Sequence, residues 1–86
     1  MTLPTPSVEA GVIDVLKNVS RRPIEPQRES DLIADLGFDS LQVIETVSEL
    51  EDRFDISIPM DDVPSIRTVA QVVDHVARLV DARSAT

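Results

Sequence analysis

The stretch D-L-G-F-D-S-L over residues 35–41, continued by Q-V-I-E-T-V-S-E-L-E-D-R-F over residues 42–54, decides the fold. A glycine-bearing loop ends at Asp39 or Ser40, either of which can cap a helix, and from Leu41 to Phe54 the sequence contains neither Gly nor Pro. At about 100° per residue, one face of this helix is predicted to be the core face. It consists of Val43, Val47, Leu50 and Phe54, with Ile44 and Thr46 at its margins.

The opposite face of the predicted helix is acidic. It carries Leu41, Glu45, Ser48 and Asp52 at i, i+4, i+7 and i+11, with Glu49 beside them. Glu45 and Glu49 are like charges four residues apart, which oppose the helix by a few tenths of a kcal/mol. Local stability therefore does not explain this face. On charge alone, the favoured interpretation is a solvated face that only keeps the protein in solution, and the alternative is a surface for a basic partner.

Outward from this segment, the sequence predicts two further helices and a long loop. Ser7 is expected to cap a helix from Val8 to about Ser20, and T-V-A-Q at residues 68–71 matches the capping box that begins the last helix. Residues 61–65 can form only a short helical turn around Pro64. The apolar residues of the long loop between the first two helices, which should hold it to the core, are Ile24, Leu32, Ile33 and Leu36.

We therefore predict an all-α fold, a small four-helix bundle of three main helices plus one short helix, with a long loop between helices one and two. The predicted core stripes are Val8, Val12, Val15, Leu16 and Val19 in the first helix, and Val69, Val72, Val73, Val76, Leu79 and Val80 in the last. Residues 1–86 are expected to form a single domain with an ordered core over about residues 7–82.

Length, charge and composition exclude several classes of protein. Eighty-six residues leave little room to enclose a large cofactor together with a full catalytic constellation, and zero cysteines exclude disulfides and thiol nucleophiles. A net charge of −8 argues against nucleic acid as a partner. Because no stretch approaches the roughly 20 apolar residues of a spanning helix, no membrane insertion is expected. We expect a cytoplasmic monomer that serves other proteins.

Ser40 is the residue best placed for chemistry. Its hydroxyl lies at the first turn of a helix, where free N–H groups and the positive end of the helix dipole favour a bound or attached phosphate. Ser40 is thus placed to carry a phosphodiester, but without further context the favoured interpretation is that Ser40 or Asp39 merely caps the helix. His75, the only histidine, is expected at the surface or boundary rather than in a triad with Ser40, and no metal site is expected.

The run D-L-G-F-D-S-L-Q-V-I-E-T-V-S-E-L-E-D-R-F-D-I-S-I-P, residues 35–59, resembles the phosphopantetheine-attachment region of acyl carrier proteins. T-V-A-Q-V-V-D-H-V, residues 68–76, is similar to the last helix of that family, so the resemblance spans about Ser7 to Val80. It implies a non-catalytic carrier. A separate Mg-dependent transferase would join 4'-phosphopantetheine from coenzyme A to Ser40, and the arm would present acyl thioesters to fatty-acid, polyketide or related biosynthetic enzymes.

The resemblance also implies where partners and cargo lie. The transferase and acyl-processing enzymes, through basic docking patches, would meet Asp39, Leu41, Glu45, Ser48, Glu49 and Asp52. An acyl chain held between the helices would be lined by Val43, Val47, Leu50 and Ile58, although each is equally well explained as core. Phe38 stands where many members have a smaller residue and is expected beside the arm, where it would alter the accepted partners or cargo.

Two alternatives stay open. The first is an acidic helical interaction subunit of the same fold, which docks a basic enzyme without being modified. The second is a peptidyl carrier for aminoacyl groups, although G-F-D-S-L at residues 37–41 and the acidic helix look more like acyl carriers. Within the acyl carriers, Thr46, Ser48 and Arg53 depart from the pattern of fatty-acid carriers, so a specialised pathway is at least as well supported as primary fatty-acid synthesis.

Overall fold

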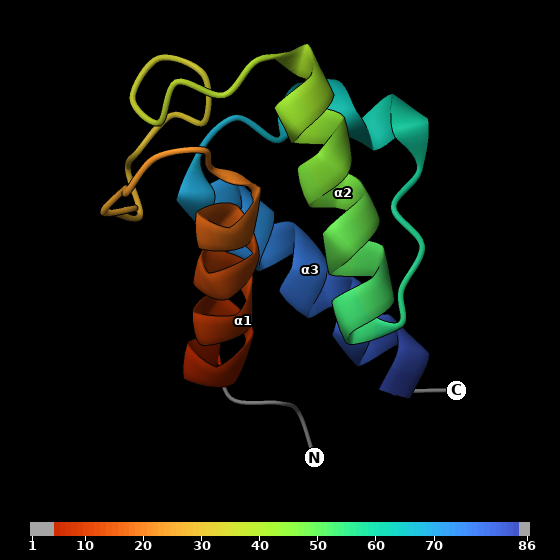
Figure 1. Ribbon diagram of the computed structural model, residues 1–86. Helices are drawn as coiled ribbons and strands as arrows, with labels where there is room; N and C mark the ends of the chain where they lie inside the picture. Colours follow the sequence, from red (N-terminus) through yellow and green to blue (C-terminus); the bar gives the residue numbers. More distant parts are fainter. Residues whose placement is uncertain (1–4, 85–86) are drawn as a thin grey trace.

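The computed structural model describes residues 5–84, which form three α-helices and one 3-10 helix. In chain order these are α1 (Thr5–Val19), α2 (Ser40–Phe54), η1 (Met60–Ser65) and α3 (Val69–Ser84). Helix α1 packs against both α2 and α3, and η1 lies near the beginning of α2 (Figure 1). The all-α four-helix prediction is confirmed. The predicted domain limits at residues 1 and 86 lie outside the described residues.

The valine-rich stripes of α1 and α3 meet in the core, as predicted. Every predicted stripe residue is buried except Leu79, which is partly buried. The loop between α1 and α2 adds three buried side chains, Leu32, Leu36 and Phe38. Burying branched apolar side chains in this way is the main favourable contribution to the stability of a small bundle.

Ile33 does not join the core, and that prediction is wrong. Residues 31–36 form one helical turn, in which the backbone N–H of Asp35 and of Leu36 both donate to the carbonyl of Asp31. Leu32 and Leu36, four residues apart, therefore share the inner face of the turn. Ile33 is rotated about 100° from Leu32 and is exposed.

Backbone hydrogen bonds pin the loop to the start of α3. The N–H of Leu32 donates to the carbonyl of Arg67 at 2.9 Å, and the N–H of Val69 donates to the carbonyl of Ser30 at 3.0 Å. Asp31 and Thr68 form an antiparallel bridge between the same two segments. These bonds satisfy backbone groups that a free loop would leave to water, and they fix one side of the region that surrounds Ser40.

Helix α1 begins earlier than predicted. It starts at Thr5, so Ser7 lies inside the helix and is not its cap. Pro6 falls in the first turn, where its missing N–H removes no intrahelical hydrogen bond, so it does not delay the helix. The capping box of α3 is as predicted. Thr68 Oγ1 accepts from the N–H of Gln71 at 3.2 Å, and Gln71 Oε1 accepts from the N–H of Thr68 at 3.0 Å.

The inward face of α2 is rotated from the predicted one. Its buried residues are Gln42, Thr46 and Leu50, the predicted core residues Val43, Val47 and Phe54 are partly buried, and Ile44 is exposed. Hydrogen bonds make this burial of polar side chains possible. Gln42 Nε2 donates to the carbonyl of Val19 at 3.4 Å, and Thr46 Oγ1 donates to the carbonyl of Gln42 at 2.8 Å.

Candidate functional site

Ser40 is the first residue of α2, and its side chain is exposed. Asp39, not Ser40, caps the helix. Asp39 Oδ1 accepts from the N–H of Gln42 at 2.8 Å, and Gln42 Oε1 accepts from the N–H of Asp39 at 3.1 Å. Because this reciprocal capping box already satisfies the start of the helix, the Ser40 hydroxyl is not needed for capping. It remains accessible at the positive end of the helix dipole.

The loop before Ser40 explains the glycine in the motif. Gly37 has φ +75°, a backbone conformation that residues with a Cβ rarely adopt. A Cβ at this position would also lie 2.5 Å from Arg22 Nη2. The turn at Gly37 lets Phe38 enter the core, where it is only 2% exposed. The expectation that Phe38 lies beside the arm is therefore wrong, because its side chain packs beneath the loop instead.

A groove of about 530 Å³ has Ser40 in its wall. Its other walls come from three segments that are distant in the sequence: the first turns of α2, the loop turn at residues 31–33, and the stretch from η1 to Arg67. The lining is mainly apolar and includes Val43, Ile44, Ile33 and Met60. The Ser40 hydroxyl thus lies next to a space that can receive an extended apolar chain.

The four residues predicted to line an acyl chain do not share one environment. Val43 lines the groove beside Ser40. Leu50 and Ile58 are buried in the core, and Val47 is packed against it, partly buried. The rest of the apolar lining, which includes Ile44 and Met60, comes from residues that the sequence did not single out for this role.

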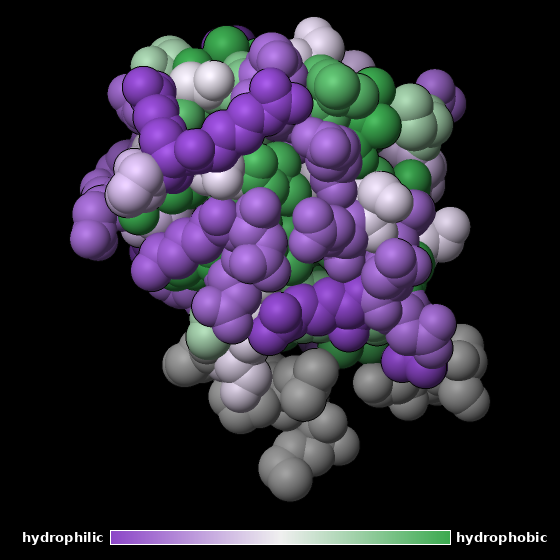
Figure 2. Space-filling model, viewed as in Figure 1, coloured by the Kyte–Doolittle hydropathy of each residue, from purple (hydrophilic) through white to green (hydrophobic). Residues whose placement is uncertain are grey.

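The predicted docking residues lie together along the outside of α2. Leu41, Glu45, Ser48 and Asp52 are exposed, as is Asp39 before them, and Glu49 is partly buried. Figure 2, which is viewed as in Figure 1, shows hydrophilic side chains over much of the face of the molecule on which α2 lies. Arg53, the base within this acidic segment, pairs with Asp14 of α1 at 3.2 Å. Its charge is therefore directed at α1 and does not neutralise Glu45.

The exposed apolar side chains gather around Ser40. Within the described part of the chain, the exposed large hydrophobic residues are Ile33, Leu41, Ile44 and Met60, each 50–66% exposed. Leu41 follows Ser40 directly, and the other three line the groove. Periodicity in the sequence assigns apolar residues to a core, so only Leu41 was identified as a surface residue. Such a cluster is typical of a surface that contacts another molecule.

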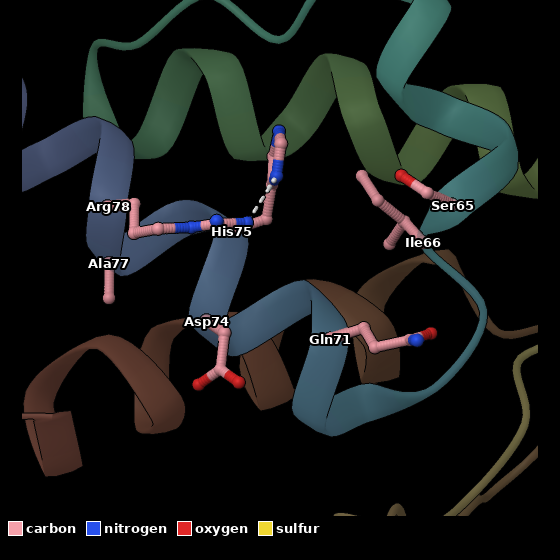
Figure 3. Close-up of a pocket in the computed structure, with 7 residues that line it drawn as sticks. All are labelled: Ser65, Ile66, Gln71, Asp74, His75, Ala77 and Arg78. Atoms are coloured by element: carbon pink, nitrogen blue, oxygen red, sulfur yellow. Dashed lines mark hydrogen bonds between the residues drawn. The ribbon is translucent and has the colours of Figure 1, made fainter.

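His75 lies in a different cavity. Figure 3 shows it rising from α3 towards α2, in a cavity of about 510 Å³ that is also lined by Ser65, Asp74 and Arg78. His75 Nε2 lies 3.2 Å from Asp62 Oδ2, and the side chain is 14% exposed, which is a boundary position. Ser40 does not line this cavity, so the structure assembles no triad from Ser40 and His75.

Within residues 5–84, no three His, Cys, Asp or Glu side chains are grouped so that they could hold a metal ion. None of the described helices combines the length and apolar character needed to cross a membrane.

Comparison with known proteins points to one family. A family model described as a phosphopantetheine attachment site matches residues 10–76. The acyl carrier protein of Syntrophobacter fumaroxidans is 39% identical over 75 residues, which are 84% of this chain and 90% of that protein. The acyl carrier protein of Chlorobium phaeobacteroides is 42% identical over 60 residues, covering 70% of this chain and 74% of that protein.

Solved structures show the same fold. A Mycobacterium tuberculosis protein described as an acyl carrier protein superimposes with a TM-score of 0.78 at 35% identity, covering 83% of this chain and 96% of that one. The acetyl actinorhodin acyl carrier protein of Streptomyces coelicolor superimposes with a TM-score of 0.64 at 22% identity, covering 96% of each chain. The second likeness is one of fold alone.

Proposed function

The chain belongs to the acyl carrier protein family, and from that premise we propose that Ser40 is the residue to which 4'-phosphopantetheine is attached. The family brings with it the function of carrying acyl groups and the phosphopantetheine cofactor. The position of Ser40 is the observation that supports this residue as the attachment site. Its hydroxyl is exposed at the first residue of α2, is spared from capping by Asp39, and lies beside the groove.

The chemistry requires little of the chain beyond this hydroxyl. Ser40 Oγ loses its proton and bonds to the pantetheine-side phosphorus of coenzyme A, and 3',5'-ADP leaves with the electrons of the broken P–O bond. A separate Mg-dependent transferase would catalyse this transfer. When attached, the arm supplies the thiol that this cysteine-free chain lacks and that holds an acyl group as a thioester. We propose that the chain itself is non-catalytic, which is supported by the separation of Ser40 from His75.

The docking surface consists of the predicted acidic face of α2 and the apolar residues beside it. Glu45, Glu49 and Asp52 would attract basic patches on the transferase and on acyl-processing enzymes, with Asp39 and Ser48 at the edges of the contact. Leu41 would enter an apolar pocket of the partner close to Ser40. Such contacts are fast, salt-sensitive and weak, which suits a single-domain monomer that must leave each enzyme for the next. We propose that these successive contacts with enzymes take place in the cytoplasm, where coenzyme A is supplied.

The groove is our proposed site for the acyl chain. Val43 and Ile44 would contact the chain from α2, and Met60 and Val63 would contact it from η1. The apolar lining favours a hydrocarbon segment over water. Val47, Leu50 and Ile58 lie deeper, and they would reach the cargo only if α2 and η1 moved apart.

Intact mass spectrometry tests the attachment. The protein is incubated with coenzyme A, Mg²⁺ and a broad-specificity phosphopantetheinyl transferase, and we expect a gain of one phosphopantetheine group. Ser40→Ala should abolish the gain, and Ser57→Ala should not, because Ser57 is an exposed serine that lies outside both the docking surface and the groove. No gain in the wild type, or a gain that persists in Ser40→Ala, would overturn the proposal.

The same variants separate the alternatives. An unmodified interaction subunit would keep full biological activity in Ser40→Ala, whereas a carrier would lose it. A peptidyl carrier would be loaded by amino-acid adenylating enzymes. We expect loading with fatty or ketoacyl groups instead, detected as a further mass increase on the modified protein.

A further inference from the structure

The groove beside Ser40 contains a basic side chain, Arg67, within its mainly apolar lining. The backbone of Arg67 is fixed on both sides. Its N–H donates to Gln71 Oε1 at 2.9 Å, and its carbonyl accepts from the N–H of Leu32 at 2.9 Å. The side chain therefore starts from a rigid point while remaining 72% exposed. The fixed backbone keeps the guanidinium within reach of the groove.

Asp31 occupies little of the hydrogen-bonding capacity of Arg67. Arg67 Nη2 lies 3.5 Å from Asp31 Oδ2, a long and exposed contact of a kind that contributes little. Asp31 Oδ1 already accepts from the N–H groups of Ile33 and Ala34, each at 2.9 Å. These two bonds lower the pKa of Asp31 more than Arg67 does. Since a guanidinium has five N–H donors, Arg67 retains donors for a ligand in the groove.

We propose that Arg67 donates a hydrogen bond to an oxygen of the acyl cargo, so that the groove selects acyl chains bearing a ketone over plain hydrocarbon chains. This inference rests on the proposed function and defines its substrate class. The apolar walls formed by Val43 and Met60 suit the methylene segments of such a chain, and Arg67 supplies the donor that a ketone oxygen needs when it leaves water.

A neutral ketone fits this site better than a second carboxylate. Asp31 also lines the groove, and its lowered pKa keeps it negatively charged at neutral pH. A carboxylate on the cargo would have to leave water beside that charge and compete with it for Arg67. A ketone accepts the same hydrogen bond without like-charge repulsion.

The test uses the modified 86-residue chain without any partner enzyme. Its arm is loaded with octanoyl, 5-oxooctanoyl, 7-oxooctanoyl or suberyl groups, and loading is verified by intact mass. A protection ratio is obtained for each chain as the hydrolysis rate of the matching free pantetheine thioester divided by that of the protein-bound thioester. We expect at least one oxo chain to be protected about threefold to tenfold more than octanoyl, the range that the net contribution of one solvent-exposed hydrogen bond supplies.

Three variants and a spectroscopic readout assign the effect to Arg67. Arg67→Gln should remove the preference for oxo chains, and Arg67→Lys should retain part of it. Arg78→Gln should leave it unchanged, because Arg78 lines the other cavity. In ¹H–¹⁵N spectra, the Arg67 Nε–H signal should shift with the protected oxo chain and not with octanoyl. Matching thermal melts of the variants would show that the fold is retained.

Several results would overturn this inference while leaving the proposed function intact. They are equal protection of octanoyl and both oxo chains, strongest protection of the suberyl chain, a preference that survives Arg67→Gln, and an equal loss in Arg78→Gln. A preference that appears only when a partner enzyme is added would assign Arg67 to docking and would also overturn it. Failure to modify Ser40 at all would instead remove the proposed function, and this inference with it.

Discussion

Gly11 of α1 faces Phe54 at the end of α2, where the two helices meet. A Cβ on Gly11 would lie 2.6 Å from Phe54 Cζ, well inside van der Waals contact. Replacing Gly by Ala in a helix gains about 1 kcal/mol of intrinsic propensity, but overpacking costs about 1–3 kcal/mol. We therefore expect Gly11→Ala to lower the free energy of unfolding by about 1 kcal/mol, measured by urea denaturation.

A second background isolates the contact with Phe54. In Phe54→Leu the ring atom nearest Gly11 is absent, so Gly11→Ala should there be neutral or stabilising. The difference between the two backgrounds is the coupling energy of a double-mutant cycle. An equal loss in both backgrounds would show that the ring is not the cause.

Asp31 gives the stability of the protein a defined dependence on pH. Hydrogen bonds from the N–H groups of Ala34 and Ile33, and to a lesser degree Arg67, hold its pKa below the ordinary value of 3.8. A pKa lowered by folding adds stability above the unfolded value, and this stability is lost as the pH falls through the folded value. Asp31→Asn should therefore be less stable than wild type at pH 7, and the difference should shrink below about pH 4. Urea denaturation across this range measures it, and a constant difference would contradict it.

Among the secondary-structure elements, α2 depends on Asp39 for its start, and Asp39 also lies on the proposed docking surface. Asn caps helices about as well as Asp, whereas Ala costs about 1 kcal/mol. Asp39→Asn should keep the melting temperature and slow transfer of phosphopantetheine to Ser40. Asp39→Ala should both slow transfer and lower the free energy of unfolding by about 1 kcal/mol. Unchanged transfer in Asp39→Asn would leave Asp39 with a capping role alone.

Helix α2 also shows what the sequence reveals about an element. The absence of Gly and Pro and the apolar periodicity predicted its extent correctly, with its start one residue late. Periodicity misplaced its inward face because it treats polar residues as exposed. Gln42 and Thr46 are buried because hydrogen bonds satisfy them, and the bond from Gln42 ends on Val19 of another helix. A tertiary contact of this kind leaves no local pattern.

The candidate site was likewise predictable only where it depends on residues that are close in the sequence. Ser40 and the acidic face follow from residues that are neighbours along one helix, so the sequence alone placed them together. The groove was not predictable, because its walls join Ile33, Val43 and Met60 from three separate segments. Apolar character also led to the assignment of Ile33 in the long loop to the core, since it does not distinguish a buried side chain from one kept exposed for contact.

Across the whole molecule, the charge is unevenly distributed. Ten of the sixteen acidic residues lie between residues 31 and 62, together with a single base, Arg53. Arg53 pairs with Asp14, and Arg28 pairs with Glu9, so both cations are directed at carboxylates of α1. Charges are screened over about 8 Å at physiological salt. The molecule extends over 37 × 25 × 19 Å, so a docking enzyme senses the face it approaches rather than the net charge.

Two charge-reversal variants distinguish a local acidic face from net charge. Glu45→Lys with Glu49→Lys changes the α2 face, and Glu25→Lys with Glu29→Lys changes two exposed acids of the long loop. Each reversal adds two charges, so both double variants move the net charge from −8 to −4. We expect the α2 variant to slow modification of Ser40 about tenfold at low ionic strength, because it removes the local attraction to a basic transferase. It should also lose the salt dependence that we expect of the wild type.

The loop variant is the matched control. If docking is local, its modification rate should stay within about twofold of wild type at every salt concentration, and its salt dependence should persist. Equal slowing in both variants would mean that the transferase responds to the overall field of the protein. Unchanged rates in both would remove charge from the docking mechanism and leave Leu41 and the apolar rim of the groove as the contacts that select this carrier.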